Sequence, residues 1–185
     1  MDRVEKAVEY YMRYFNCSQG VFAAYAVDMG FDEKLALMVA TNFGGGARKG
    51  ELCGAVAGAL MVLGLKYGHS DSGDFASKTR AYEIAEAYMD RFIRENGSVV
   101  CRELLGLDLT DPNDREIIRE KNLFRTKCPE MVRSAAQIHV HRHAVVLQPG
   151  DVLCRQRPVH IRAEEDAVLR HALRRTPAAQ LSCIM

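Results

Sequence analysis

The sequence predicts an all-α protein, a compact multi-helix single domain with a buried central helix over residues 1–137, followed by an irregular C-terminal extension over residues 138–185. Apolar residues recur at helical spacing through most of the first part, and residues 53–65 are apolar throughout. The composition then changes: no Phe or Tyr follows Phe124, no Lys follows Lys127, and five of the six histidines lie in the extension. A length of 185 residues suits one domain and a tail.

Three helices are expected before the central one. Val4, Ala7, Val8 and Tyr11 mark an amphipathic helix over residues 2–15. Asn16 is a suitable N-cap for a second helix that carries a cysteine in its first turn and stops near residue 30. A third helix should begin near residue 32 and end at the glycine triplet of residues 44–46.

The central helix is predicted from Cys53 to Leu65 and is too short to cross a bilayer. Each of its three glycines weakens the helix by about 1 kcal/mol relative to alanine. Close approach of another backbone or of a cofactor would offset this loss of stability. Gly54 and Gly58 are therefore candidate cofactor-binding positions. With Glu51 near the helix start, Cys53 is expected in the first turn, where the positive end of the helix dipole favours a thiolate.

The helices that follow place two more cysteines at helix starts. A long helix is expected over residues 75–95, ended by Asn96-Gly97, with an inner face marked by Tyr82, Ile84/Ala85, Tyr88/Met89 and Phe92. A short helix is expected from Cys101, another over residues 114–124, and a last one that opens at Cys128 with proline in its first turn. Helix N-termini would compensate the negative charge of converging thiolates, so that no lysine cluster is needed.

The candidate metal ligands or redox groups are accordingly Cys17, Cys53, Cys101 and Cys128. We expect their sulfurs to meet at the N-terminal end of the central helix, with the glycines after Cys53 lining the same region. These are single cysteines, unlike the paired Cys-x-x-Cys of structural zinc sites, so their spacing alone is a weak signal.

The formal charge of +1 gives no electrostatic case for nucleic acid, and no segment suggests membrane insertion. The N-terminus lacks a signal-peptide pattern, so a cytoplasmic location is expected, where six cysteines favour metal binding or thiol redox chemistry over a disulfide scaffold. Residues 44–50 lack the Gly-Lys-Ser/Thr of a phosphate loop and are expected to form a turn. No Ser-His-Asp arrangement or paired-acid motif indicates an enzyme, so whether the protein catalyses a reaction stays open.

Four motifs resemble one family. They are Asn16-Cys17-Ser18-Gln19, Gly50-Glu51-Leu52-Cys53-Gly54-Ala55-Val56-Ala57-Gly58, Cys101-Arg102-Glu103-Leu104-Leu105-Gly106 and Cys128-Pro129. Together they closely resemble the redox-active proteins labelled C_GCAxxG_C_C, over about residues 3–137; Leu52 stands where the label has glycine. The resemblance implies a small helical prokaryotic protein that is redox-active through its four cysteines. A related domain in a split-Soret type cytochrome lies beside an iron–sulfur centre, which favours a cluster here, whereas no Cys-x-x-Cys-His indicates attached haem.

The sequence leaves three chemistries open. The first is an iron–sulfur cluster for electron transfer, held by the four thiolates. The second is a thiol–disulfide protein without metal, in which Cys53 attacks and another cysteine resolves. The third is a structural zinc site, and a helical interaction module with cysteines as core fillers is the remaining alternative. A redox partner protein and a homodimer are both compatible with the sequence.

The extension resembles nothing in the family. Residues 138–143 alternate like a strand and would place His139, His141 and His143 on one face, unless the preceding helix continues and scatters them. No acidic or cysteine partner stands at a fixed offset, so a poorly packed extension is favoured over a metal site. Cys154 and Cys183 are not assigned to the site.

Overall fold

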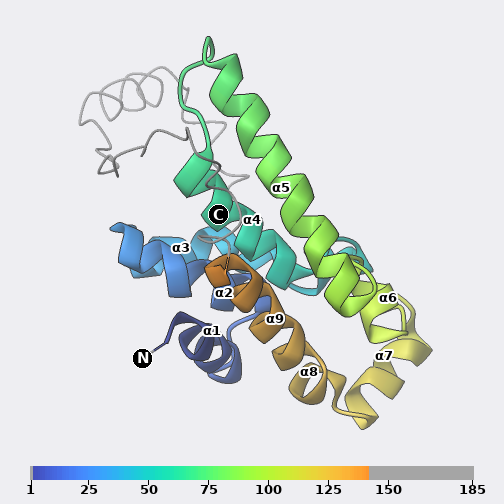
Figure 1. The fold of residues 1–185 in the computed structure, drawn as a ribbon. Coiled ribbons are helices and arrows are strands. Elements are labelled where there is room, and N and C mark those ends of the chain that lie inside the picture. Colours follow the sequence, from blue (N-terminus) through green and yellow to red (C-terminus); the bar gives the residue numbers. More distant parts are fainter. Residues whose placement is uncertain (1, 142–185) are drawn as a thin grey trace, which may run out of the picture. The chain divides into compact units, whose positions relative to one another are not determined.

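The computed structural model describes residues 2–141, and every regular element in this range is helical (Figure 1). The only β feature there is an isolated bridge between Leu52 and Val100. The predicted all-α fold is therefore confirmed for the described residues. Within the same range no helix combines the length and the apolar character needed to cross a membrane.

The first helices begin where capping side chains occur in the sequence. Helix α1 spans Arg3–Met12, α2 spans Cys17–Ala26 and continues as the 3₁₀ turn η1 (Val27–Met29), and α3 spans Glu33–Ala40. Asn16 and Gln19 form a capping box at the start of α2, in which each side chain accepts a hydrogen bond from the backbone of the other residue. Gly30 ends this segment in the left-handed conformation, as predicted.

The core lies where α2 crosses α4 (Gly54–Tyr67), and α1, α3, α5 and α9 pack around this pair. The central buried helix is confirmed: α4 is enclosed from Gly54 to Ala59 and again at Val62 and Leu63. Helix α2 is enclosed more completely, because nine of its ten residues are buried. The prediction that α4 is the most enclosed helix was wrong, since α2 lies between α1, α3, α4 and α9.

The long helix α5 spans Phe75–Asn96 and buries Ile84, Tyr88 and Phe92. These residues belong to the predicted inner face, from which Tyr82 departs because its side chain is exposed. Gly97 ends the helix in the left-handed conformation, as the Asn-Gly pair indicated.

The last elements are α6 (Cys101–Leu105), α7 (Pro112–Glu120), α8 (Leu123–Thr126) and α9 (Cys128–His141). The single helix expected over residues 114–124 was wrong. Asp111 caps α7 at Pro112, and Asn122 adopts a positive φ of 52° that separates α7 from α8. The strand expected over residues 138–143 was wrong as far as His141, because α9 continues to that residue. His143, Cys154, Cys183 and the rest of the predicted extension lie outside the described residues.

Candidate functional site

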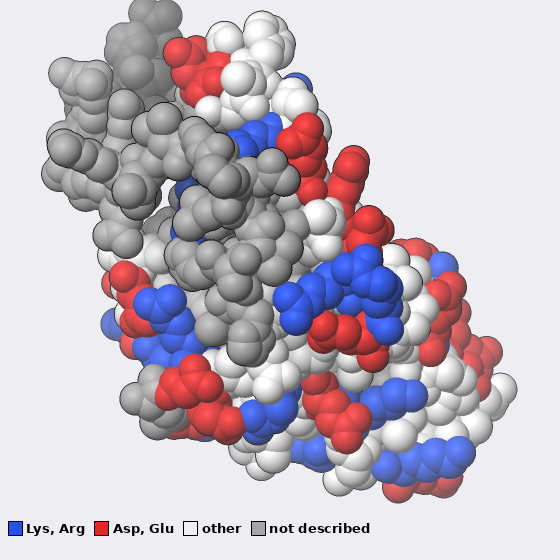
Figure 2. Space-filling view, in the orientation of Figure 1, with Lys and Arg blue, Asp and Glu red and all other residues white. Residues whose placement is uncertain are grey.

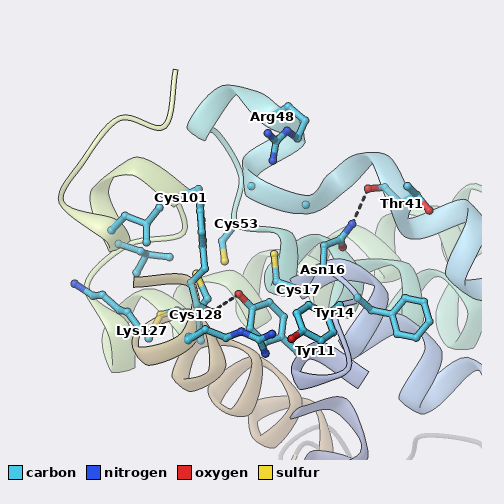
Figure 3. Close-up of a pocket in the computed structure, with 18 residues that line it drawn as sticks. Tyr11, Tyr14, Asn16, Cys17, Thr41, Arg48, Cys53, Cys101, Lys127 and Cys128 are labelled. Carbon is cyan, nitrogen blue, oxygen red and sulfur yellow. Dashed lines mark hydrogen bonds between the residues drawn. The ribbon is translucent and has the colours of Figure 1, made fainter. Parts of the chain in front are cut away.

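The four candidate cysteines line one cavity of about 300 Å³ (Figure 3). Cys17, Cys101 and Cys128 are the first residues of α2, α6 and α9, and Cys53 is the N-cap residue of α4. All four are free thiols, three of them buried and Cys128 partly exposed. The structure thus brings together helix starts that lie far apart in the sequence, and we refer to this cavity as the cysteine chamber.

Cys53 is placed differently from the expectation. Its backbone angles, φ −52° and ψ 129°, are not helical, so it precedes the first turn of α4, and Glu51 lies outside the helix. The Cys53 N–H donates to Val99 O at 2.7 Å, and the Cys101 N–H donates to Glu51 O at 2.6 Å. These bonds flank the Leu52–Val100 bridge and fix the Cys53 and Cys101 segments side by side. This pairing was not predicted, although the β-branched pair Val99-Val100 favours extended backbone there.

Gly54 and Gly58 face α2 at close range. A Cβ atom on Gly54 would overlap the Cys17 sulfur and lie 2.8 Å from Phe43 O, and one on Gly58 would lie 2.6 Å from Ser18 O. Glycine at these positions therefore lets the two helix backbones approach and leaves room for the Cys17 side chain. Neither residue lines the chamber. A Cβ atom added to Gly64, by contrast, would have no neighbouring atom within 4 Å.

The loop before α4 covers the chamber with a left-handed turn. Gly45, Gly46, Ala47 and Arg48 all have positive φ, of 63°, 62°, 50° and 64°. Positive φ is unfavourable for Ala47 and Arg48, and such strain costs on the order of 1–3 kcal/mol per residue. The turn expected over residues 44–50 is thus present: it follows η2 (Thr41–Phe43) and contains the segment η3 (Gly46–Gly50), in which Ala47 and Arg48 are not helical. It places Arg48 at the chamber wall (Figure 3).

Burial raises the pKa of every thiol in the chamber. Desolvation is the main cause for each, and it raises the pKa of Cys101 to about 12 and that of Cys128 to about 11. For Cys53, burial and then the charge of Cys17 raise the pKa, while hydrogen bonds from the backbone of Ala55 and Val56 act in the opposite direction. The expectation that Cys53 has a lowered pKa was therefore wrong, because the loss of hydration on burial raises its pKa more than the N-terminal end of α4 lowers it.

Cys17 lies at the electrostatic centre of the group. Its own pKa is raised by burial, against hydrogen bonds from backbone groups that include Gly45, Ser18 and Ala55. A charge on Cys17 in turn raises the pKa of each of the other three thiols. Like charges repel most strongly at short range in a protein interior, so this effect of Cys17 agrees with the four thiols lining one cavity.

Tyr11 links the chamber to the α8–α9 junction. Its hydroxyl donates to Phe124 O at 2.5 Å. This hydroxyl has one proton, which can turn from Phe124 O to the Cys128 sulfur when that thiol ionises. The hydrogen bond to the thiolate lowers the pKa of Cys128, against the larger effects of burial and of Cys17. Tyr11 was assigned to the core stripe of the first helix, and its polar end was not foreseen because the partner residue is 117 positions away (128 minus 11).

Three cations also line the chamber: Arg48, Arg125 and Lys127. No Asp or Glu is among the lining residues. The expectation that helix N-termini alone would compensate the thiolates was therefore incomplete. Arg125 and Lys127 lie two positions apart at the α8–α9 junction, whereas Arg48 belongs to the loop before α4, so the sequence gave no signal that the three would form one group.

The separation of the thiols distinguishes between two kinds of metal site. A single zinc ion requires its ligands about 2.3 Å from one centre. Within residues 2–141, no three His, Cys, Asp or Glu side chains converge closely enough to hold one ion. The four thiols instead line a cavity of about 300 Å³.

Fold and site together define a small helical protein built around a buried four-cysteine chamber. The model of the family described as "Putative redox-active protein (C_GCAxxG_C_C)" matches residues 15–141. The chain belongs to this family, as its motifs indicated, and the match includes all four cysteines. No curated protein sequence and no solved structure is significantly similar to the chain.

Proposed function

We propose that the chain is an electron-transfer protein whose cysteine chamber binds an iron–sulfur cluster through Cys17, Cys53, Cys101 and Cys128. The observation that carries the proposal is that these four thiols line one cavity of about 300 Å³ whose fixed charges are all positive. Membership of a redox-active family supports the general function. The chemistry that such a cluster supplies when bound is one-electron transfer.

The chamber residues would hold and tune this group. Thiolate is the required ligand, and burial makes each chamber thiol a weak acid, so loading must displace protons and is expected to be favoured by rising pH. Backbone hydrogen bonds to Cys17 and Cys53, and the charge of Lys127 beside Cys128, stabilise negative charge on sulfur. Hydrogen bonds to the sulfurs and nearby charge also set the reduction potential of iron–sulfur sites.

The same features argue against a metal-free dithiol function. An attacking thiol must form a thiolate near neutral pH, and every chamber thiol has a raised pKa. The feature that favours this alternative is the backbone pairing that fixes Cys53 beside Cys101. A disulfide between these two residues is the outcome that the experiment must exclude.

The test is anaerobic reconstitution with ferrous iron and sulfide of the wild-type chain and of four single variants: Cys17→Ser, Cys53→Ser, Cys101→Ser and Cys128→Ser. The wild type is expected to gain broad visible absorption with iron and acid-labile sulfide in equal amounts, and each variant to lose most of both. Cys154→Ser, outside the family match, is the matched control and should behave as the wild type. Equal iron binding by all the variants, or none by the wild type, would contradict the proposal.

A further inference from the structure

We propose that the rim of the cysteine chamber is the docking surface for an acidic electron-transfer protein. The rim consists of Tyr14, Arg48, Arg125 and Lys127, all of which line the chamber. The proposal rests on the proposed function only in supposing that the partner exchanges electrons with this site. The docking surface itself is formed by the protein without metal, so it can be tested separately.

The charge of the rim is of one sign, unlike that of the face of the molecule shown in Figure 2. Figure 2 shows Lys and Arg alternating with Asp and Glu in small groups over the described part of that face. At the chamber, the lining includes three cations and no carboxylate. Arg48 and Lys127 form no ion pair with a carboxylate of residues 2–141. Because the net charge is only +1, this local group and not the whole molecule would attract an anionic partner.

Tyr14 gives the rim an aromatic anchor. Its side chain is 88% exposed, and its backbone has a positive φ of 73°, which is rare for a residue other than glycine. The guanidinium of Arg125 lies 4.4 Å from the centre of the Tyr14 ring and donates to Met12 O at 3.0 Å. The pair is thus held in place before any partner binds, which reduces the loss of side-chain freedom on association.

The composition of this surface indicates a protein as the occupant. Tyr and Arg are the residues that most often dominate the binding energy of protein interfaces. Met12 and Phe124 next to the pair are also substantially exposed, at 44% and 41%. A small anion could neutralise the cations, but it would leave this apolar surface in water. An acidic protein surface with an apolar centre matches both features.

The rim also lies over the thiols that would carry the electron. Lys127 directly precedes Cys128, the most exposed of the four cysteines, and Arg48 comes from the loop that covers the chamber. A partner bound here would therefore approach the site from its open side. A short path through this mouth is what electron transfer between two proteins requires.

The experiment measures binding of an acidic [2Fe–2S] ferredoxin, used as the probe, to the metal-free full-length chain by isothermal titration calorimetry. The wild type is expected to bind with a Kd that increases at least tenfold between 20 mM and 300 mM salt, the trend expected for screened charges. The double variant R48E/R125E should lose at least tenfold in affinity at low salt. Lys34→Glu, the same charge change on α3 outside the rim, is the matched control.

The salt dependence of the wild type keeps the proposal testable if the double variant fails to fold, which circular dichroism would show. Salt-independent binding, no binding at low salt, or equal affinities of the folded double variant and the wild type would overturn it. Displacement of the ferredoxin by millimolar inorganic phosphate at constant ionic strength would also overturn it, in favour of a small-anion site. Failure of iron and sulfide to bind would leave these results unchanged and would count only against the proposed function.

Discussion

Gly54 is the residue that makes room for the Cys17 sulfur. A Cβ atom at position 54 would overlap this sulfur and lie 3.3 Å from the Cα atom of Gly44. The start of α4, the start of α2 and the covering loop therefore meet at one glycine. The motif with glycine directly after the second cysteine has a packing reason that involves the first cysteine.

Gly54→Ala is expected to destabilise the fold and to disturb the chamber. The added methyl group must displace either the Cys17 side chain or the loop backbone, and overpacking of this kind costs about 1–3 kcal/mol. Urea unfolding of the metal-free protein measures the loss, and alkylation of Cys17 with mass spectrometry measures its displacement. Gly64→Ala in the same helix is the control, since its added atom meets nothing within 4 Å and should stabilise the helix by up to about 1 kcal/mol. Equal stabilities of the two variants would show that Gly54 has no packing role.

Tyr11→Phe is expected to slow the reaction of Cys128 with iodoacetamide in the metal-free protein. The hydrogen bond from Tyr11 lowers the pKa of this thiol, although burial and Cys17 raise it more, so its removal reduces the thiolate fraction at a given pH. The rate is followed at Cys128 by peptide mass spectrometry.

The control for this variant is Tyr25→Phe, which also removes one buried hydrogen bond, from the Tyr25 hydroxyl to Ala136 O at 2.8 Å. Each variant should lose about 1 kcal/mol of stability. Only Tyr11→Phe should change the reactivity of Cys128. The same change in both variants would mean that general loosening, and not the Tyr11 contact, determines the rate.

The metal-free protein should lose stability in alkaline solution through its thiols. Burial raises the pKa of Cys101 to about 12 and that of Cys128 to about 11, whereas an unfolded cysteine titrates near pH 8.5. The unfolded chain therefore loses these protons first. The stability that the two protonated thiols give to the folded state is fully present below about pH 8.5 and is lost as the pH rises toward 12. Urea unfolding at a series of pH values checks the sign.

A variant with Cys101→Ala and Cys128→Ala should show a shallower decline over this range. Part of the decline should remain, because burial also raises the pKa values of Tyr11, Tyr25 and Tyr88, whose protons the unfolded chain loses near pH 10. An equally steep decline in the variant would show that the thiols do not contribute.

The sequence predicted those features that depend on neighbouring residues. The cap at Asn16, the helix ends at Gly30 and Gly97, and a cysteine at each of four helix starts follow from local hydrogen bonding and turn geometry. The match of the C_GCAxxG_C_C model confirms the resemblance, and the four cysteines line one chamber.

The features that depend on distant residues were not predictable in this way. The pKa of Cys53 follows from its burial among α2, α4 and the loop, and the bridge that fixes Cys53 beside Cys101 joins segments 48 residues apart (101 minus 53). Likewise, Arg48, Arg125 and Lys127 become one group only when the loop over the chamber meets the α8–α9 junction. Long-range packing, and not local propensity, decides these properties.

Native mass spectrometry of the chain, purified without oxygen, distinguishes an iron–sulfur cluster from the alternatives, because each proposed chemistry changes the mass differently. We expect an added mass of iron and sulfide in equal numbers, lost on Cys17→Ser and kept on Cys154→Ser. A single added zinc, or a metal-free chain lighter by two hydrogens from a disulfide, would contradict it.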